Sequence, residues 1–341
     1  TGVYNVHIGM QAGYGAASNS ANTNTFVGYK TGYDVTSGYN NVALGGSALE
    51  NLTTGIENVV IGNNAGDALT TTSNVVLVGR NAGGAINSAD ANGTVAVGYQ
   101  AGLSITSGQE AVLVGYLAGH KLTTGDSDTA IGYKALGGDQ TGALTGNSNT
   151  AVGRHAMSKA YDSATKNTSM GNQSLESLTN GSFNTAFGAY AGDNLTTGAG
   201  NTYLGYYALP SAVDITDEIL IKAGTGTSMT GGGTETVRIG VESDYITNDF
   251  GENATWTHSS DRRVKKNIED NDLGLGFIEK LRTRKFQKKA PSEYPEEFDQ
   301  HNSDTTERKN PDRIHYGFVA QEVKEAMDSV GHSEFPVWKE N

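Results

Sequence analysis

The sequence is organised around a glycine that returns about every 17 residues. Every copy has Val or Thr three positions before this glycine and an apolar residue directly before it. Self-similarity at a fixed period of this length is the signature of stacked repeat architectures. The twelve central glycines, separated by 17 to 21 residues, are Gly9, Gly28, Gly45, Gly62, Gly79, Gly98, Gly115, Gly132, Gly153, Gly171, Gly188 and Gly205.

Each copy predicts one short β-strand followed by a tight corner. Side chains two apart in a strand point to the same face, so we expect the residues three and one before the glycine to line the inside of a coil. Ala stands three after the glycine in ten of twelve copies, where a corner excludes bulk. Turn-rich links such as Thr53, Thr54 and Gly55 lead to the next strand. Coils stacked at about 4.8 Å predict a rod on the order of 60 Å long.

Asparagine stands four positions before the glycine in eight copies, among them Asn41, Asn58, Asn149, Asn184 and Asn201. Stacked asparagines are typical of turn and ladder hydrogen bonds, and this interpretation is favoured over ligand contacts. The residues expected inside the coil are small, so the core of a single chain would be thin. Three chains sharing one axis would complete it, and the predicted assembly is a homotrimer.

A tyrosine follows the central glycine in five copies: Tyr29, Tyr99, Tyr116, Tyr133 and Tyr206. An exposed aromatic ladder could contact the sugar rings of a host surface, but a structural stack of equivalent positions is the favoured interpretation.

Other residues of the repeat region offer little chemistry. His7, His120 and His155 stand at different offsets, so no metal site is expected. Asp126 and Asp128 lack the full spacing of a calcium loop. No repeated carboxylate pair marks a glycosidase, and no cofactor is expected.

Charge and composition exclude several function classes. The chain has 341 residues, a formal charge of −13 and no cysteine. Residues 1–259 hold 20 acidic and 9 basic residues, a net of −11, which argues against nucleic acid binding. No apolar run approaches the roughly 18 residues of a membrane span, so no membrane insertion is expected.

The character of the chain changes twice along its length. The repeat covers residues 1–209, and residues 210–259 read as a connecting β region that closes the shaft near Trp256. Residues 260–341 hold 15 of the 24 basic residues but few glycines. Helical apolar spacing in Ile268–Leu281 and Val319–Val330 predicts a small mixed α/β domain here.

Two motifs in this last domain carry a resemblance. The first, at 260–268, reads SDRRVKKNI and precedes the apolar-rich LGFIEKL at 275–281. The second, at 315–323, reads HYGFVAQEV. In order and spacing, they resemble the peptidase S74 family, the intramolecular chaperone domain of endosialidases and other phage tail proteins. The domain of that family generally continues into further helix, so its trimer-clamping part is expected to lie beyond Asn341.

The resemblance implies a self-cleaving Ser/Lys dyad, here Ser260 and Lys265, with Asp261 and Arg263 as positioning residues. Such chemistry is plausible, because a lysine whose pKa is lowered by neighbouring cations can take the serine proton. Arg262, Arg263 and Lys266 supply that positive charge. This would be an autoproteolytic endopeptidase that acts once, with no substrate-turnover enzyme evident.

The repeats of residues 1–209 resemble the head repeats of trimeric autotransporter adhesins and of phage tail fibres. The expected fold is therefore mainly β, a trimeric β-roll or β-helix shaft followed by a small mixed α/β chaperone domain. The expected function is that of a virion tail fibre or tailspike, made in the host cytoplasm and bound to other virion tail proteins. Its partner on the host would be a surface glycan or protein. A polysaccharide-degrading spike and a bacterial trimeric surface adhesin remain the alternatives.

Overall fold

The computed structural model describes residues 2–15, 20–137, 142–251, 253–257, 274–287, 289–293 and 314–331. The chain divides into two compact units, Thr1–Ser259 and Ser260–Asn341. Each unit is described by itself.

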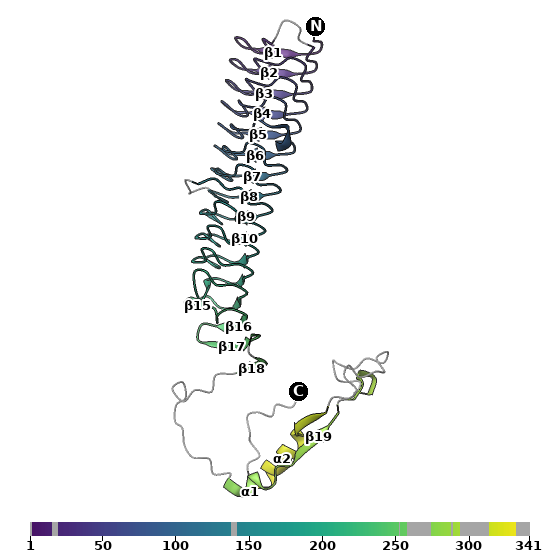
Figure 1. Cartoon of the computed structure of the whole chain (residues 1–341), viewed down its shortest axis with the longest axis vertical. Coiled ribbons are helices and arrows are strands. Elements are labelled where there is room, and N and C mark those ends of the chain that lie inside the picture. The colour runs from purple at the N-terminus through teal and green to yellow at the C-terminus, as the bar shows by residue number, and fades with distance from the viewer. Residues whose placement is uncertain are drawn as a thin grey trace. The chain divides into compact units, whose positions relative to one another are not determined.

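The first unit is a β-solenoid in which each repeat forms one coil and contributes one three-residue strand (Figure 1). Consecutive strands pair in parallel and in register, so equivalent residues of the repeat stand directly above one another. These strands are β1 (Val6–Ile8), β2 (Thr25–Val27), β3 (Val42–Leu44), β4 (Val59–Ile61), β5 (Val76–Val78), β6 (Val95–Val97), β7 (Val112–Val114), β8 (Thr129–Ile131), β9 (Thr150–Val152), β10 (Thr168–Met170), β11 (Thr185–Phe187) and β12 (Thr202–Leu204).

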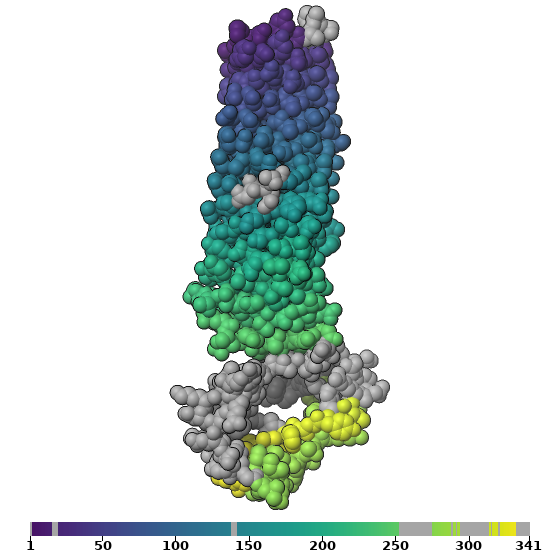
Figure 2. Space-filling model, turned by 60° about the vertical axis from the view of Figure 1, so that its left-hand side comes forward, coloured from purple at the N-terminus to yellow at the C-terminus, as the bar shows by residue number. Residues whose placement is uncertain are grey.

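The parallel sheet continues beyond the glycine repeat through β14 (Ile219–Lys222) and β16 (Thr236–Val241). It then ends in an antiparallel part formed by β17 (Asp244–Asp249) and β18 (Asn253–Thr257). A second small sheet pairs β13 (Ala208–Leu209) with β15 (Met229–Thr230), and a 3-10 turn spans Ala89–Ala91. The colours of Figure 2 run in bands along this unit, as expected when each coil contacts mainly its neighbours.

The middle residue of each strand points into the coil, which corrects the prediction about its inner face. Phe26, Leu77, Leu113 and Tyr203 are fully buried at this position. The residues three and one before the central glycine lie on the opposite face of the strand and point out. Alternation within a strand separates the two faces, but it does not say which of them is covered.

We call this outward surface of β1–β12 and β14 the outer sheet face. All of its side chains remain partly or fully exposed, with Ile8 at 59%, Leu44 at 47% and Leu204 at 45%. It consists of Val6, Thr25, Val42, Val59, Val76, Val95, Val112, Thr129, Thr150, Thr168, Thr185, Thr202, Ile219, Ile8, Val27, Leu44, Ile61, Val78, Val97, Val114, Ile131, Val152, Met170, Phe187, Leu204 and Ile221.

Two further buried ladders complete the interior of the coil. Nine of the ten alanines three after the central glycine, such as Ala65 and Ala118, are fully buried, as the corner prediction requires. A ladder seven after the glycine was not predicted; it holds Val35, Leu52, Leu69, Ile86, Ile105, Leu122, Leu178 and Leu195, all fully buried. One chain therefore has a continuous core of its own, and the prediction that this core would be thin is wrong because the inward residues include Leu, Ile, Phe and Tyr.

The central glycines are required by both conformation and close approach. Their φ angles lie between +118° and +147°, a region that L side chains rarely adopt. A Cβ on any of them would lie 2.0 to 2.8 Å from a carbonyl oxygen of the next coil. Stacking at the strand spacing leaves no room for a side chain at this corner.

The asparagines four before the glycine form the predicted ladder. The Nδ2 atom of Asn41 donates to Asn24 Oδ1 and to the carbonyl oxygen of Gly55, both at 3.0 Å. Asn58 repeats this pattern one coil later, with bonds to Asn41 and Thr72. Because each amide satisfies buried polar groups of the adjacent coils, the ladder aligns them.

The ladder ends at a buried carboxylate. The backbone N of Glu218 donates to Asn201 Oδ1 at 2.9 Å. Its carboxylate accepts hydrogen bonds from the hydroxyl of Tyr203 and from the backbone N atoms of Ser211 and Gly233. Three donors thus compensate this buried side chain.

The second unit holds α1 (Gly274–Ile278), β19 (Thr283–Phe286), a 3-10 turn at Pro291–Glu293, β20 (His315–Phe318) and α2 (Ala320–Asp328). Strands β19 and β20 form an antiparallel pair. The predicted helix of Val319–Val330 is confirmed as α2, with Ala326 and Met327 buried. For Ile268–Leu281 the described part is helical only over Gly274–Ile278, and a strand follows two residues after Leu281.

Candidate functional site

The predicted dyad lies outside the described residues. Ser260, Asp261, Arg263 and Lys265 all fall between Thr257 and Gly274, where no positions are described. Their roles remain predictions based on the motif. What the structure adds is the local setting of the second motif, at 315–323.

A bidentate ion pair joins the second motif to β19. Arg284 Nε donates to Glu322 Oε1 at 3.0 Å and to Oε2 at 2.8 Å, and Nη2 also bonds Oε1. The hydrogen bond to Arg284 holds the pKa of Glu322 below its usual value, against a smaller opposing effect of desolvation. Lys280 Nζ donates to Ser329 Oγ at 2.8 Å. These two contacts hold α2 at both ends: Glu322 near its start is bound to β19, and Ser329 after its end is bound to the segment before β19. No role for Arg284 or Lys280 was predicted from the sequence.

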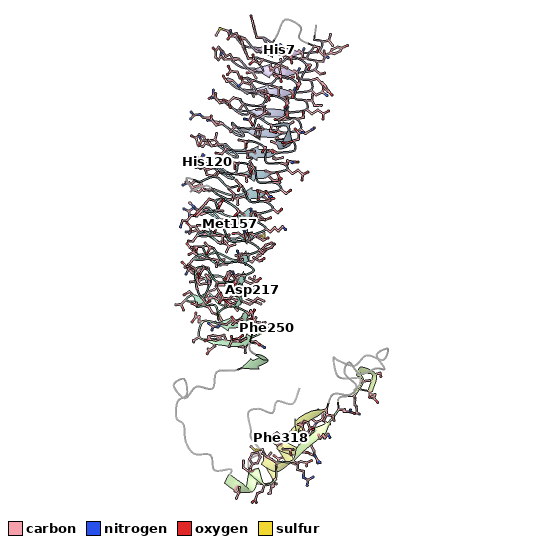
Figure 3. All side chains as sticks on the ribbon, viewed as in Figure 1. His7, His120, Met157, Asp217, Phe250 and Phe318 are labelled. Atoms are coloured by element: carbon pink, nitrogen blue, oxygen red, sulfur yellow. The ribbon has the colours of Figure 1, made fainter. Side chains whose placement is uncertain are left out.

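Large apolar side chains of the second unit are exposed. Leu275 is 70% exposed, Tyr316 is 76% exposed and Phe318, labelled in Figure 3, is 53% exposed. Among the residues described in this unit, the buried apolar side chains are Ala290, Ala326 and Met327. The described part of this unit thus exposes more large apolar side chains than it buries.

The tyrosines of the shaft form stacks rather than isolated platforms. Tyr99 and Tyr116 stack at 5.1 Å between ring centroids, and Tyr116 and Tyr133 stack at 5.3 Å. Guanidinium groups lie over the two outer rings, Arg80 over Tyr99 and Arg154 over Tyr133. Ring faces inside this stack are covered by one another, which agrees with the favoured structural interpretation.

The other two tyrosines are placed differently. Tyr29 is 47% exposed with Lys30 Nζ 5.8 Å from its ring, and Tyr206 packs edge-on against Tyr207. Contact of any of the five tyrosines with a glycan stays a prediction.

The histidines are not gathered into a site. His7 stacks on Phe26, and His155 lies tilted against Tyr133. His120 is half-buried several coils away, as its label and that of His7 show in Figure 3. Within the described ranges, no group of three or more His, Asp or Glu could hold a metal ion. The helices described in the structure include none long and apolar enough to cross a membrane.

Asp128 occupies an asparagine position of the ladder. Its Oδ1 accepts hydrogen bonds from the backbone N of Asn149 at 2.7 Å and from Asn149 Nδ2 at 3.0 Å. Its Oδ2 is buried without a partner. A Cβ at Gly125 would lie 2.6 Å from this Oδ2 and 2.3 Å from the carbonyl oxygen of Gly146. Oδ2 thus stands where the other coils place an amide Nδ2 that donates to the corner carbonyl.

Burial raises the pKa of Asp128 to about 7, against the weaker opposing effect of its hydrogen bonds with Asn149. The sequence signal for this site was available, because Asp128 stands four before Gly132, where eight other copies have Asn. A protonated Oδ2 can donate toward the Gly146 carbonyl, whereas an ionised one faces another acceptor.

We expect Asp128→Asn to stabilise the shaft at pH 8 and to have little effect near pH 4. A raised pKa in the folded state means that the fold retains a proton that the unfolded chain loses above its ordinary pKa of 3.8. Stability therefore falls as the pH rises from about 4 to about 7, by up to roughly 1.4 kcal/mol per pH unit. Asparagine removes this loss and supplies the missing donor.

The measurement is the thermal midpoint of the shaft across this pH range. Asp214→Asn, at an exposed carboxylate, is the matched control and should leave the pH profile unchanged. Equal midpoints for wild type and Asp128→Asn at pH 8 would show that the ionised Asp128 does not destabilise the fold and that burial does not raise its pKa.

Comparison with known proteins identifies the second unit. Residues 260–332 match the Peptidase S74 family, described as chaperone of endosialidase. No curated protein and no solved structure matches the chain. The match begins at Ser260, which is also the first residue of the second compact unit. The chain thus carries a β-solenoid shaft followed by a Peptidase S74 chaperone domain.

Proposed function

We propose that this chain is the distal part of a homotrimeric virion fibre whose S74 domain directs trimerisation and then cuts the chain beside Ser260. The observation that carries the proposal is the order of the two units: a long parallel solenoid is followed at once by a chaperone domain.

The first task of the chaperone domain is to align three shafts. Equivalent residues recur in every coil of the solenoid, so one chain can meet another in several wrong registers, each shifted by a whole coil. Contacts between chains are also costly to form before the ends are brought together. A domain that associates first raises the local concentration of the shafts and sets their alignment. The exposed apolar side chains Leu275, Tyr316 and Phe318 suit such an association.

The second task is a single self-cleavage. Lys265, as a neutral amine, takes the proton from Ser260 Oγ, and Oγ forms a bond to the carbonyl carbon of the adjacent peptide. The C–N bond of that peptide then breaks, and its nitrogen receives the proton from Lys265. Water hydrolyses the resulting ester and restores the Ser260 hydroxyl. Loss of the chaperone makes unfolding of the shaft effectively irreversible, and the fibre becomes kinetically stable.

The mature shaft serves in attachment to a host surface, through a glycan or a protein receptor. As part of a virion tail, it is made in the host cytoplasm and bound at its other end to further tail proteins. Tyr29 and Tyr206, which are exposed and lie outside the stack of Tyr99, Tyr116 and Tyr133, offer aromatic surface for such contacts.

Light scattering on the purified chain tests the assembly. We expect the mass of three chains, and we expect deletion of residues 260–341 to reduce the yield of that species strongly. A wild-type chain that stays monomeric at micromolar concentration would overturn the proposal. Attachment is tested separately, by binding of the labelled trimer to whole host cells before and after enzymatic removal of surface glycans.

A further inference from the structure

We infer that the outer sheet face is the surface through which three copies of the shaft contact one another, parallel and in register. This inference rests on the proposed trimer and adds the face that forms it. The occupant is a second and a third copy of this chain.

The first argument is the chemistry of the face. Across β1–β12 and β14, every outward side chain is aliphatic, aromatic, Met or Thr, and none carries a charge or an amide. The whole chain nevertheless has a formal charge of −13. In a parallel trimer with cyclic symmetry, each residue meets its own copies at the same height, so any charge on the shared face would meet two like charges. A face without charge is therefore what self-association needs.

The second argument is its periodicity. The face presents rows of two side chains at the spacing of parallel strands, about 4.8 Å, over about 60 Å. In-register pairing keeps Val or Thr in one column, with Ile219 at its end, and Val, Ile, Leu, Met or Phe in the other. A partner that packs against all rows must repeat at the same rise, and another copy of this solenoid does so.

The third argument is the charge at the two edges of the face. The exposed residues five before the central glycine include Glu57 and Glu110, with Lys166 as the basic exception. The residues directly after the glycine include the exposed Arg80 and Arg154 and no acidic residue. In a cyclic trimer the leading edge of each chain meets the trailing edge of the next. Glu57 and Arg80 belong to adjacent coils and would attract across this edge, whereas Glu110 and Arg154 are two coils apart.

The size of the face is also adequate. Rows about 7 Å wide over about 60 Å give on the order of 400 Å² per chain before the edges are counted. A contiguous apolar patch of this size is about the largest that a typical soluble monomer exposes, and such patches are often functional.

Cysteine cross-linking tests the face directly, because the chain has no native cysteine. Ile131→Cys and Thr129→Cys place a thiol on the two columns of the same strand, and Thr124→Cys places one on an exposed turn of the same coil. All three variants of the full chain are treated with a short bismaleimide and run on a denaturing gel. We expect cross-linked dimers from at least one face variant, reaching at most about two thirds of the chains, because one linker joins two of three thiols. Thr124→Cys should stay uncross-linked.

Light scattering on the same samples keeps the two claims apart. If the variants are trimeric but neither face thiol cross-links, or if Thr124→Cys cross-links instead, the inferred face is wrong while the trimer stands. If the unmodified chain is monomeric, the proposed trimer itself fails, and the inferred face fails with it.

Discussion

Ser260→Ala is expected to leave the polypeptide as one uncut band on a denaturing gel, where the wild type gives two. Removal of the hydroxyl eliminates the nucleophile, and no covalent intermediate can form. Lys265→Ala should also stay uncut, because loss of a general base costs on the order of 10²- to 10⁴-fold in rate. Lys265→Arg should fail as well, since a guanidinium stays protonated and cannot accept the serine proton.

The matched control for these variants is Lys266→Ala, which removes a neighbouring positive charge without touching the dyad. It should still be cut, although more slowly if Lys266 helps to lower the pKa of Lys265. Trimer mass should be unchanged in Ser260→Ala, because assembly precedes cleavage. Cleavage that persists in Ser260→Ala would remove Ser260 as the nucleophile and would direct the search to another residue.

Ile131→Asp is expected to leave the chain uncut although its dyad is intact. Ile131 lies on the outer sheet face and is 40% exposed in the single chain, so an aspartate there need not disturb the solenoid interior. In the trimer, however, three carboxylates would meet at one height with little access to water, which is strongly unfavourable. The shafts would then fail to close in register. Without an assembled shaft, we expect Lys265 to stay hydrated and protonated, so that it cannot act as a base.

Thr124→Asp adds the same charge to the same coil at an exposed turn and should be cut at the wild-type rate. Circular dichroism of Ile131→Asp should retain the β spectrum, which separates a failed interface from a misfolded shaft. The measurement is the ratio of cut to uncut chain over time. If Ile131→Asp is cut as fast as the wild type, cleavage does not depend on assembly of the shaft. It would then be a processing step that does not report on correct folding.

The repeat made several features of the fold predictable from local chemistry. A glycine in the corner is required by a positive φ and by the carbonyl of the next coil, and the three-residue strand before it follows from side-chain alternation. The asparagine ladder followed from the recurrence of Asn four before the glycine. The S74 domain was predictable for a different reason, because two separate motifs occur in the right order. The positions of Ser260 and Lys265 lie outside the described residues, so their roles still depend on those motifs.

Other features depend on how the coils close. The strand pattern places two classes of residue on opposite faces, but only the closed coil shows that Leu113 points in and Ile131 points out. The sizes of the inward side chains compensate for one another across the coil. Leu113 fills the space beside Gly119, whereas the small Ala130 is accompanied by the larger Leu136, and all four residues are buried.

Asp128 shows the same limit for a single residue. The sequence shows that Asp128 takes an asparagine position of the repeat. It does not show that the pKa of Asp128 is raised, because this depends on the carbonyl of Gly146 and on complete burial of Oδ2. Neither is local to residue 128. A regular repeat therefore defines the coil and its stacking, because each position meets its own equivalent in the next coil. Only the closed coil brings together the groups that decide which face of the strand is covered. The same groups decide how much an exception such as Asp128 destabilises the shaft.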